Sequence, residues 1–350
     1  MGLREYIIRR LILLIPVALG VVLLIFAVLQ LVPPTRRVTL FIAENPKMLK
    51  PEIVQHYIHV YGLDQPVWVQ FYVWLSEVSK GNLGYSEYWQ EKVLDGLVAR
   101  FPATLEIVIF ATPVIIFLGI WLGIKSAVYR DKPFDHFTRV MAILGTSLPS
   151  FFFGIILSAI FIAQLKWVSS GRLSTSMSAQ LAIMIKNGEW TQYTGLYTID
   201  ALINGRPEYF VDALAHLVLP VTVLTFIQTA TLMRVARSSM LEALSKMYII
   251  AAKAKGLSSK EIINKHARRN ALIPVVTISG LLVGGMMTGL VITETVFRFP
   301  GLGNWAATAA LNLDISVVAA YALFSAIVFV LANLIVDILY AYIDPRIRLG

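Results

Sequence analysis

Residues 251–276, AAKAKGLSSKEIINKHARRNALIPVV, combine cationic side chains with small and helix-breaking residues. Lys and Arg can bind phosphate groups, and a basic helix-turn-helix can place them on nucleic acid. Small residues instead let the surface of another protein approach the backbone, while a cationic rim steers that partner. The stretch also fits the ordinary positive charge on the cytoplasmic side of a membrane protein. The surrounding chain must decide between these three interpretations.

Other chemical signatures are sparse. The sequence contains no Gly-Lys dipeptide, so it has no phosphate-binding loop for ATP, and it lacks the G-x-S-x-G and H-E-x-x-H patterns of common hydrolases. With no cysteine, it can form neither disulfides nor thiolate metal sites. His56 and His59 could both contact a metal, but no third ligand is near in sequence, which favours a solvated surface. We expect no catalytic residue, no metal site and no cofactor in this chain.

The composition indicates a membrane protein. Hydrophobic residues make up 57% of the 350 residues and charged residues only 15%, compared with about 25% charged in soluble domains. Six apolar windows are long enough to cross about 30 Å of hydrocarbon. They lie near residues 11–32, 103–124, 138–165, 212–233, 271–293 and 315–341. We predict an all-α membrane protein with six transmembrane helices, the third one kinked or broken at Pro149.

The distribution of charge predicts the orientation. The chain has 30 Lys and Arg against 21 Asp and Glu. Most of the basic residues fall in the N-terminus, in 125–139, in 234–270 and in the C-terminus, where acidic residues are the minority. By the positive-inside rule, we predict a multi-pass cell-membrane protein with both termini in the cytoplasm. A DNA-binding helix is disfavoured because 234–270 is tethered at both ends by membrane spans.

The spans divide the chain into three parts. Residues 1–33 form the cytoplasmic N-terminus and the first span, and 34–102 form an external subdomain. Residues 103–350 form a five-helix core that carries an external loop, 166–211, and a cytoplasmic loop, 234–270.

Turn residues predict local structure in the external subdomain. Pro51 suits the start of a helix, Gly62 its end and Pro66 the start of the next helix. The aromatic residues that follow, Trp68, Phe71, Tyr72 and Trp74, suit an interfacial surface.

The cytoplasmic loop reads as two short helices. The first should end at Gly256, which favours the left-handed conformation of a helix C-terminus. Ser258 and Glu261 form an S-x-x-E capping box that should start the second helix, over residues 259–269.

The loop resembles that of a known family. YIIAAKAKGLSSKEIINKHARRNALIPVVT is similar to the cytoplasmic loop of permease subunits of binding-protein-dependent ABC importers, of the oligopeptide/dipeptide "B" type. Further fragments follow in family order, including GLDQPVWVQFYVWL, GNLGYS, RFPATLEI, SLPSFFFGIIL, HLVLPVTVL, ARSSMLE, VFRFPGLG and NLIVDILYAYIDPRIR. The resemblance covers almost the whole chain and implies the fold of a type I ABC importer permease.

The resemblance also implies partners. A second, homologous permease would complete the pathway, two ABC ATPase subunits would bind ATP and Mg, and an extracytoplasmic binding protein would deliver the substrate. Nucleic acid is not an expected partner, and membrane lipid is. The loop would be the coupling region that docks on an ATPase. The residues implied in coupling are Ala251, Ala252, Lys253, Lys255, Gly256, Leu257, His266, Arg268, Arg269 and Pro274. Ile250 stands where the broad family motif has Glu, so no salt bridge is expected there.

The substrate is less determined. Oligopeptides are the default by resemblance, oligosaccharides are the alternative, and metal chelates are carried by related importers. A channel or an intramembrane enzyme is a more remote alternative.

Five residues are candidates for the pathway or its gating: Glu106, Pro149, Gly284, Gly285 and Gly289. An acid in the first turn of the second span can be functional, but it can equally favour the helix dipole and reach water. The small residues of 284–289 permit close packing as readily as they could line a pathway. Asp337 is expected to form a local ion pair near the C-terminus.

Overall fold

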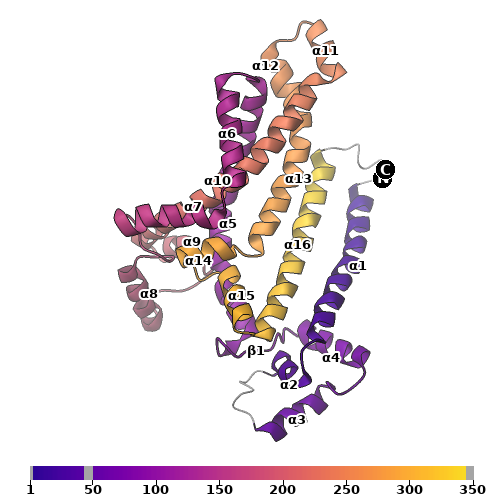
Figure 1. Cartoon of the computed structure of the whole chain (residues 1–350), viewed down its shortest axis with the longest axis vertical. Helices are drawn as coiled ribbons and strands as arrows, with labels where there is room; N and C mark the ends of the chain where they lie inside the picture. The colour runs from indigo at the N-terminus through magenta and orange to yellow at the C-terminus, as the bar shows by residue number, and fades with distance from the viewer. Residues whose placement is uncertain (1–2, 43–49, 344–350) are drawn as a thin grey trace.

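The computed structural model describes residues 3–42 and 50–343. The chain is elongated, and its helices run between two ends (Figure 1). One end carries helices α11 (Met247–Ala254) and α12 (Ser259–Glu261). The other end carries α3 (Pro51–Val60), α4 (Val67–Ser79) and strand β1 (Tyr85–Ser86). The basic loop and the segment 34–102, which the sequence predicts to be external, therefore lie at opposite ends of the molecule.

Five helical segments in the described ranges are long and apolar enough to cross a membrane: Leu11–Leu29, Val93–Val128, Pro207–Ser245, Ser259–Met287 and Ile315–Val336. The predicted third span is a broken pair, α6 (Pro133–Ser147) and α7 (Ser150–Leu157), which continues as the π-helix η3 (Ser158–Gln164). The two halves meet at an angle of 100°. Leu148, directly before Pro149 at this break, has extended backbone angles, because a proline disfavours helical conformation in the residue before it. The pair completes six spans if it is counted as one.

Two of the helices are much longer than a bilayer requires. Helix α5 (Val93–Val128) has 36 residues and α10 (Pro207–Ser245) has 39, which at 1.5 Å per residue gives about 54 and 58 Å. The apolar windows predicted only the central part of each helix. The ends are polar enough to escape a hydropathy window, yet the helix continues through them, in α5 even across Gly96 and Pro102.

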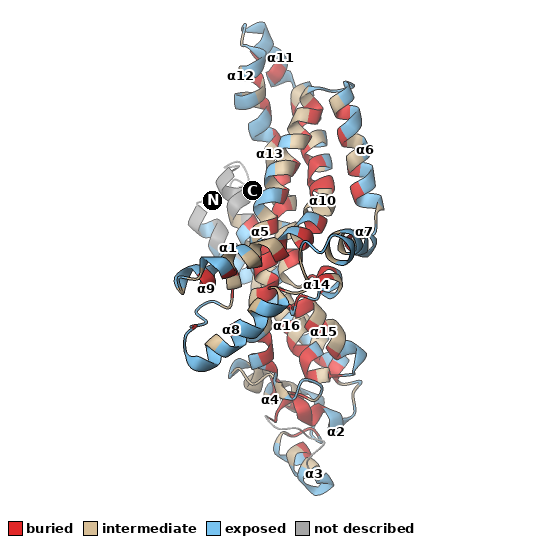
Figure 2. Ribbon diagram, turned by 90° about the vertical axis from the view of Figure 1, so that its left-hand side faces the viewer, coloured by how far each residue is buried: buried red, intermediate tan, exposed pale blue. Residues whose placement is uncertain are grey.

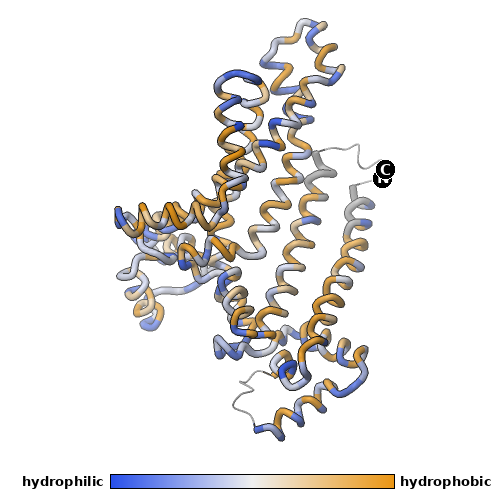
Figure 3. Tube along the Cα trace, in the orientation of Figure 1, coloured by the Kyte–Doolittle hydropathy of each residue, from blue (hydrophilic) through white to orange (hydrophobic). Residues whose placement is uncertain are grey.

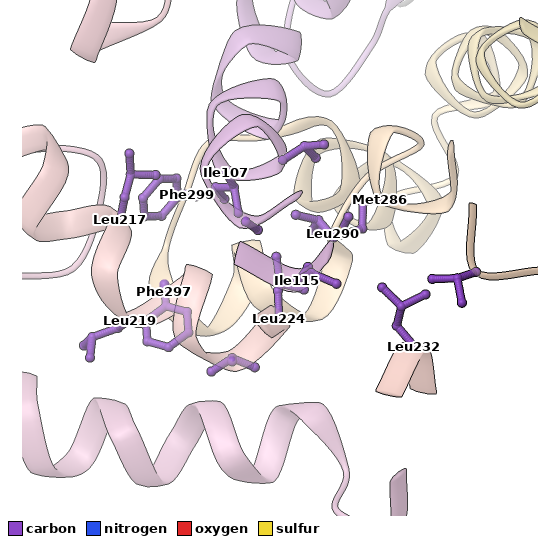
Figure 4. Close-up of a cluster of buried hydrophobic side chains, with 14 of the residues drawn as sticks. Ile107, Ile115, Leu217, Leu219, Leu224, Leu232, Met286, Leu290, Phe297 and Phe299 are labelled. Carbon is purple, nitrogen blue, oxygen red and sulfur yellow. The ribbon is translucent and has the colours of Figure 1, made fainter. Parts of the chain in front are cut away.

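Helices α5 and α10 pack closely because small residues face each other. A Cβ atom on Gly119 would lie 2.8 Å from Leu232, and one on Gly123 would lie 2.5 Å from Ala236. The main core surrounds this contact and also includes residues of α13 (Arg268–Met287). Figure 4 shows Ile107 of α5, Leu217 of α10 and Phe299 converging in this core.

The segments after α13 lead toward the end of the bundle that carries α3 and α4. Gly289, at φ +119°, breaks the helix, and short helices α14 (Val291–Phe297) and α15 (Leu302–Leu311) follow. The last helix, α16 (Ile315–Ile343), runs back beside α13 and α1 (Leu3–Leu29). Helix α1 begins and α16 ends on the same side of the molecule (Figure 1). The side chain of Asp337 and the arginines near it lie outside the described residues.

The external subdomain follows α1 through α2 (Pro34–Arg37) and the 3-10 turn η1 (Val38–Leu40). Helices α3 and α4 begin after Lys50 and Pro66, and Gly62 has φ +61° between them, as the turn residues predict. A hairpin of β1 and β2 (Glu91–Lys92) then leads into α5. One prediction was wrong here: Trp74 is only 2% exposed and packs against Phe26 of α1 instead of facing the interface.

The loop 166–211, predicted to be external, contains α8 (Thr175–Asn187) and α9 (Tyr197–Ile203). A small core joins this loop to the start of α10 and includes Leu181, Trp190 and Tyr209.

Apolar side chains cover much of the surface of the bundle. Helix α1 is hydrophobic along its length (Figure 3), yet only 6% of its apolar window is buried within the chain. Figure 2 shows exposed residues along α6 as well. An exposed surface of this kind is stable only against lipid tails or another membrane-embedded chain.

Candidate functional site

The loop at the tip of the bundle is a rigid helical hairpin. Helix α10 ends at Ser245, and Lys246 adopts extended angles that turn the chain into α11. Ile249 and Ala252 of α11 point into a core made with Met240 and Ala243 of α10 and Ile262 of the next helix. Buried packing thus attaches α11 to the end of α10 and to the helix that leads into α13.

The opposite face of α11 is apolar and exposed. Met247, Ile250, Ala251 and Ala254 follow the spacing i, i+3, i+4 and i+7, so they share one face of the helix. Met247 is 75% and Ile250 is 53% exposed. A short apolar stripe at the tip of a molecule is typical of a surface that another protein covers.

The turn after α11 is a Schellman motif. The amide of Gly256 donates to the carbonyl of Lys253 at 3.0 Å, and that of Leu257 donates to the carbonyl of Ala252 at 3.3 Å. Gly256 has φ +77°, as its position predicts, and a Cβ atom there would meet nothing within 4 Å. Glycine is therefore needed for backbone conformation and not for space within this chain.

Half of the predicted capping box forms at the next helix. The Ser258 hydroxyl accepts a hydrogen bond from the Glu261 amide at 3.3 Å. The Glu261 carboxylate does not return to the cap, because it accepts a hydrogen bond from Lys265 at 2.6 Å instead.

The second helix of the loop differs from the prediction. It does not end near residue 269 but continues from α12 through the π-helix η4 (Ile262–Ala267) into α13. The side-chain amide of Asn270 donates to the hydroxyl of Tyr248 at 3.2 Å and to the carbonyl of His266, one turn earlier, at 3.0 Å. The bond to Tyr248 links α11 to the start of α13. Pro274 lies inside α13 and leaves its helical hydrogen bond unmade.

Cationic side chains surround the apolar face. Lys246 pairs with Glu242 at 2.8 Å, and that hydrogen bond raises the pKa of Lys246 above its ordinary value. Lys265 pairs with Glu261. Five further cations form no ion pair with a described residue: Lys253, Lys255, Lys260, Arg268 and Arg269. The tip keeps a positive rim that can attract an acidic protein surface.

A buried ion pair holds the helices beneath this tip. Asp135 of α6 is fully buried, and Arg237 of α10 donates to its two oxygens, Nε to Oδ1 at 2.7 Å and Nη2 to Oδ2 at 2.9 Å. The Ser126 hydroxyl of α5 and the Asp131 amide also donate to Asp135. One carboxylate thus connects α5, α6 and α10.

The structure places most of the predicted coupling residues at this tip. Those exposed are Ala251, Lys253, Lys255, Gly256, Arg268 and Arg269, and those half-buried are Leu257 and His266. Pro274 is also exposed, but it lies inside α13, further into the bundle. Ala252 is a correction: it is buried against the chain's own core, because it lies three residues after Ile249 on the inward face. Met247 and Ile250 were missed as surface residues, although their helical spacing with Ala254 could have indicated them.

Glu106 differs from its prediction. It does not lie in a first helical turn, because α5 begins at Val93, and it is 2% exposed. Its Oε2 accepts from Arg172 Nη2 at 2.7 Å, and its Oε1 accepts from the amide and hydroxyl of Thr198 at 2.8 Å. The guanidinium of Arg172 also stacks on Tyr197. Glu106 anchors the external loop to α5.

The remaining pathway candidates have different surroundings. Pro149 marks the break between α6 and α7. Gly284 packs against α16, where a Cβ atom would lie 2.7 Å from Ala332. Gly285 is exposed, with open space around it, and Gly289 forms the turn into α14.

Glu294, a buried acid that was not among the predicted site residues, organises that turn. Glu294 is fully buried, and its carboxylate accepts from the Thr104 hydroxyl at 2.7 Å and from the Asn304 amide at 2.8 Å. It caps the first turn of α15 and links it to α5. Across the described ranges, no group of three or more His, Cys, Asp or Glu side chains is placed to hold a metal ion.

Comparison with known proteins agrees with this architecture. The profile of the family described as "Binding-protein-dependent transport system inner membrane component" matches residues 115–349. The profile of its N-terminal region matches residues 3–108. The chain belongs to this family. It is a multi-pass protein of the plasma membrane.

Several permeases are similar to it over most of their length. The dipeptide transport system permease of Escherichia coli strain K12 is 38% identical over 348 residues, which is 98% of each chain. A probable D,D-dipeptide permease of the same strain is 42% identical over 299 residues, 85% of each chain. The oligopeptide permease of Bacillus subtilis strain 168 is 33% identical over 344 residues, 98% of this chain and 99% of the other. These permeases are transport subunits, which agrees with a role other than catalysis.

Proposed function

We propose that this permease is one of two membrane subunits of an ATP-driven importer of short peptides, with both termini in the cytoplasm. Two ATPase subunits would bind ATP and Mg, and an external binding protein would supply the peptide. Relatives named for dipeptides and oligopeptides support the peptide class over oligosaccharides. The observation that carries the coupling role is the exposed apolar face of α11, at the end opposite the external subdomain.

The hairpin can transmit movement because its parts are joined. Ile249 and Ala252 pack α11 onto α10 and the helix that becomes α13, and Tyr248 bonds to Asn270. A displacement of α11 by an ATPase would therefore move α10 and α13 together. Close packing of α10 on α5 at Gly123 would carry that displacement along the bundle.

The middle of the bundle offers the elements that such a displacement would rearrange (Figure 1). The break at Pro149 and the turn at Gly289 divide helices that would otherwise be rigid rods. Hinges of this kind absorb changes in backbone angle during alternating access. The second permease would supply the opposite wall of the pathway.

The test is ATP-dependent uptake of a labelled dipeptide into liposomes that contain both permeases and both ATPases, with the binding protein added. We expect Ala251→Trp, on the exposed face of α11, to abolish uptake by blocking the docked ATPase. Ala179→Trp, on the exposed surface of α8, is the matched control and should transport like wild type. Uptake without ATPases, or normal uptake by Ala251→Trp, would contradict the proposal.

A further inference from the structure

A small basic groove lies between α6 and α10, just below the tip. It has a volume of about 250 Å³. Its lining residues are Ser126, Thr138, Arg139, Ala142, Ile143, Met233, Arg234, Arg237 and Ser238. Three guanidinium groups therefore meet in a groove whose remaining walls are hydroxyls and apolar side chains.

The positive charge of the groove exceeds what the protein neutralises. Asp135 is the one carboxylate in contact, and its oxygens already accept from Arg237, Ser126 and the Asp131 amide. Arg139 Nε makes only a long ion pair with Asp135 Oδ2, at 3.8 Å; its Nη2 contacts His136 Nδ1 at 2.7 Å, and its side chain is 42% exposed. Arg234 donates to a neutral hydroxyl, that of Thr146, at 2.8 Å. Among the described residues, the three guanidinium groups of this groove thus share the single carboxylate of Asp135.

The groove is mainly polar at one end and mainly apolar at the other. Because α6 and α10 run antiparallel, Thr138 and Arg139 at the start of α6 lie near Arg237 and Ser238 toward the end of α10. This polar end points toward the tip. Ala142, Ile143 and Met233 lie one turn further into the bundle, and the guanidinium of Arg234 beside them donates to Thr146. A molecule that fills both ends needs an anionic head and an apolar tail.

The level of the groove along the bundle matches a membrane interface. Ser126 of α5 forms its floor, and Trp121 and Tyr129 lie exposed on the same helix about one turn to either side. Exposed Trp and Tyr side chains concentrate at the headgroup level of bilayers. Beside the groove, α6 exposes Phe137, Val140 and further apolar residues, as a helix in contact with lipid does.

We propose that this groove binds the headgroup of an anionic phospholipid. The phosphate would lie between Arg139 and Arg237, with the acyl chains along Ile143 and Met233. Basic pockets between transmembrane helices are suited to anionic headgroups, since the guanidinium fork matches phosphate oxygens. This inference does not depend on which solute the importer carries.

The test is equilibrium binding of a fluorescent phosphatidylglycerol to the detergent-solubilised importer complex, with phosphatidylcholine carrying the same label as reference. One cationic contact is worth about 1 kcal/mol at a membrane surface, so we expect Arg139→Gln to weaken phosphatidylglycerol binding about fivefold. Arg130→Gln, which removes an exposed charge at the same end of α5 but outside the groove, should change it less than twofold. Neither substitution should affect phosphatidylcholine.

A second variant separates shape from charge. Ala142→Trp fills the apolar end of the groove without changing its charge, and it should also weaken phosphatidylglycerol binding. Equal binding to wild type and both groove variants, or no preference over phosphatidylcholine, would overturn the proposal. If inorganic phosphate competes while a long-chain lipid binds no better than its short-chain analogue, the site takes a soluble phosphate and the lipid assignment is wrong.

Discussion

The ion pair of Asp135 and Arg237 provides a sharp test of how the tip is fixed to the membrane helices. Asp135 is fully buried, and Arg237 is 22% exposed, so removal of the arginine leaves a carboxylate that water cannot reach. Loss of one partner of a buried pair costs about 3–5 kcal/mol. We expect Arg237→Ala to lower the Tm of the permease on the order of 10 °C.

The assay is thermal unfolding of the purified permease in mild detergent, with Arg234→Ala as the matched control. Arg234 is exposed and donates only to Thr146, so its removal should cost no more than about 0.5 kcal/mol. Adding Asp135→Asn to Arg237→Ala should restore part of the loss, because the second change removes the unpaired buried charge. If Arg237→Ala unfolds at the same temperature as Arg234→Ala, or if the double variant is no better than the single one, the reasoning is refuted.

Three further predictions concern buried and backbone constraints and use the same unfolding assay. Glu294→Ala should lower stability by about 2–4 kcal/mol because it strips acceptors from buried donors, whereas Glu294→Gln should keep much of it; equal losses would contradict the capping role. Arg172→Met should destabilise more than its combination with Glu106→Gln, since the single change leaves Glu106 charged and unpaired; the reverse order would argue against a buried pair. Gly256→Ala and Gly188→Ala both place alanine at positive φ in open space and should each cost about 1 kcal/mol; only Gly256→Ala should also weaken association with the ATPase.

Much of the fold could be predicted because it depends on local sequence. Apolar length located the spans, and Pro149 indicated the break in the third one. Gly62, Pro66 and Gly256 marked helix ends correctly, because their backbone preferences act within one turn.

The parts that sequence missed depend on contacts between distant segments. Glu106 read as an exposed acid near a helix start, but its partner Arg172 lies 66 residues away, in a loop with no predictable fold. Trp74 was predicted to lie at the membrane interface because the residue that buries it, Phe26, belongs to another helix and is distant in sequence. Ala252 was predicted to be a docking residue because composition alone does not show which face of a short helix packs against the rest of the chain.

The docking role assigned to α11 is tested most directly by the affinity of the purified permease pair for its ATPase subunits. Ile250 is 53% exposed, so covering the rest of its side chain is worth about 1–1.5 kcal/mol, or about a factor of ten in Kd. Ile250→Asn loses this contribution and adds a polar amide that must be desolvated. We therefore predict that it raises the Kd for the ATPase at least about tenfold, while Ile183→Asn on the exposed surface of α8 leaves the Kd unchanged. Equal affinity of the two variants would contradict docking through the exposed face of α11.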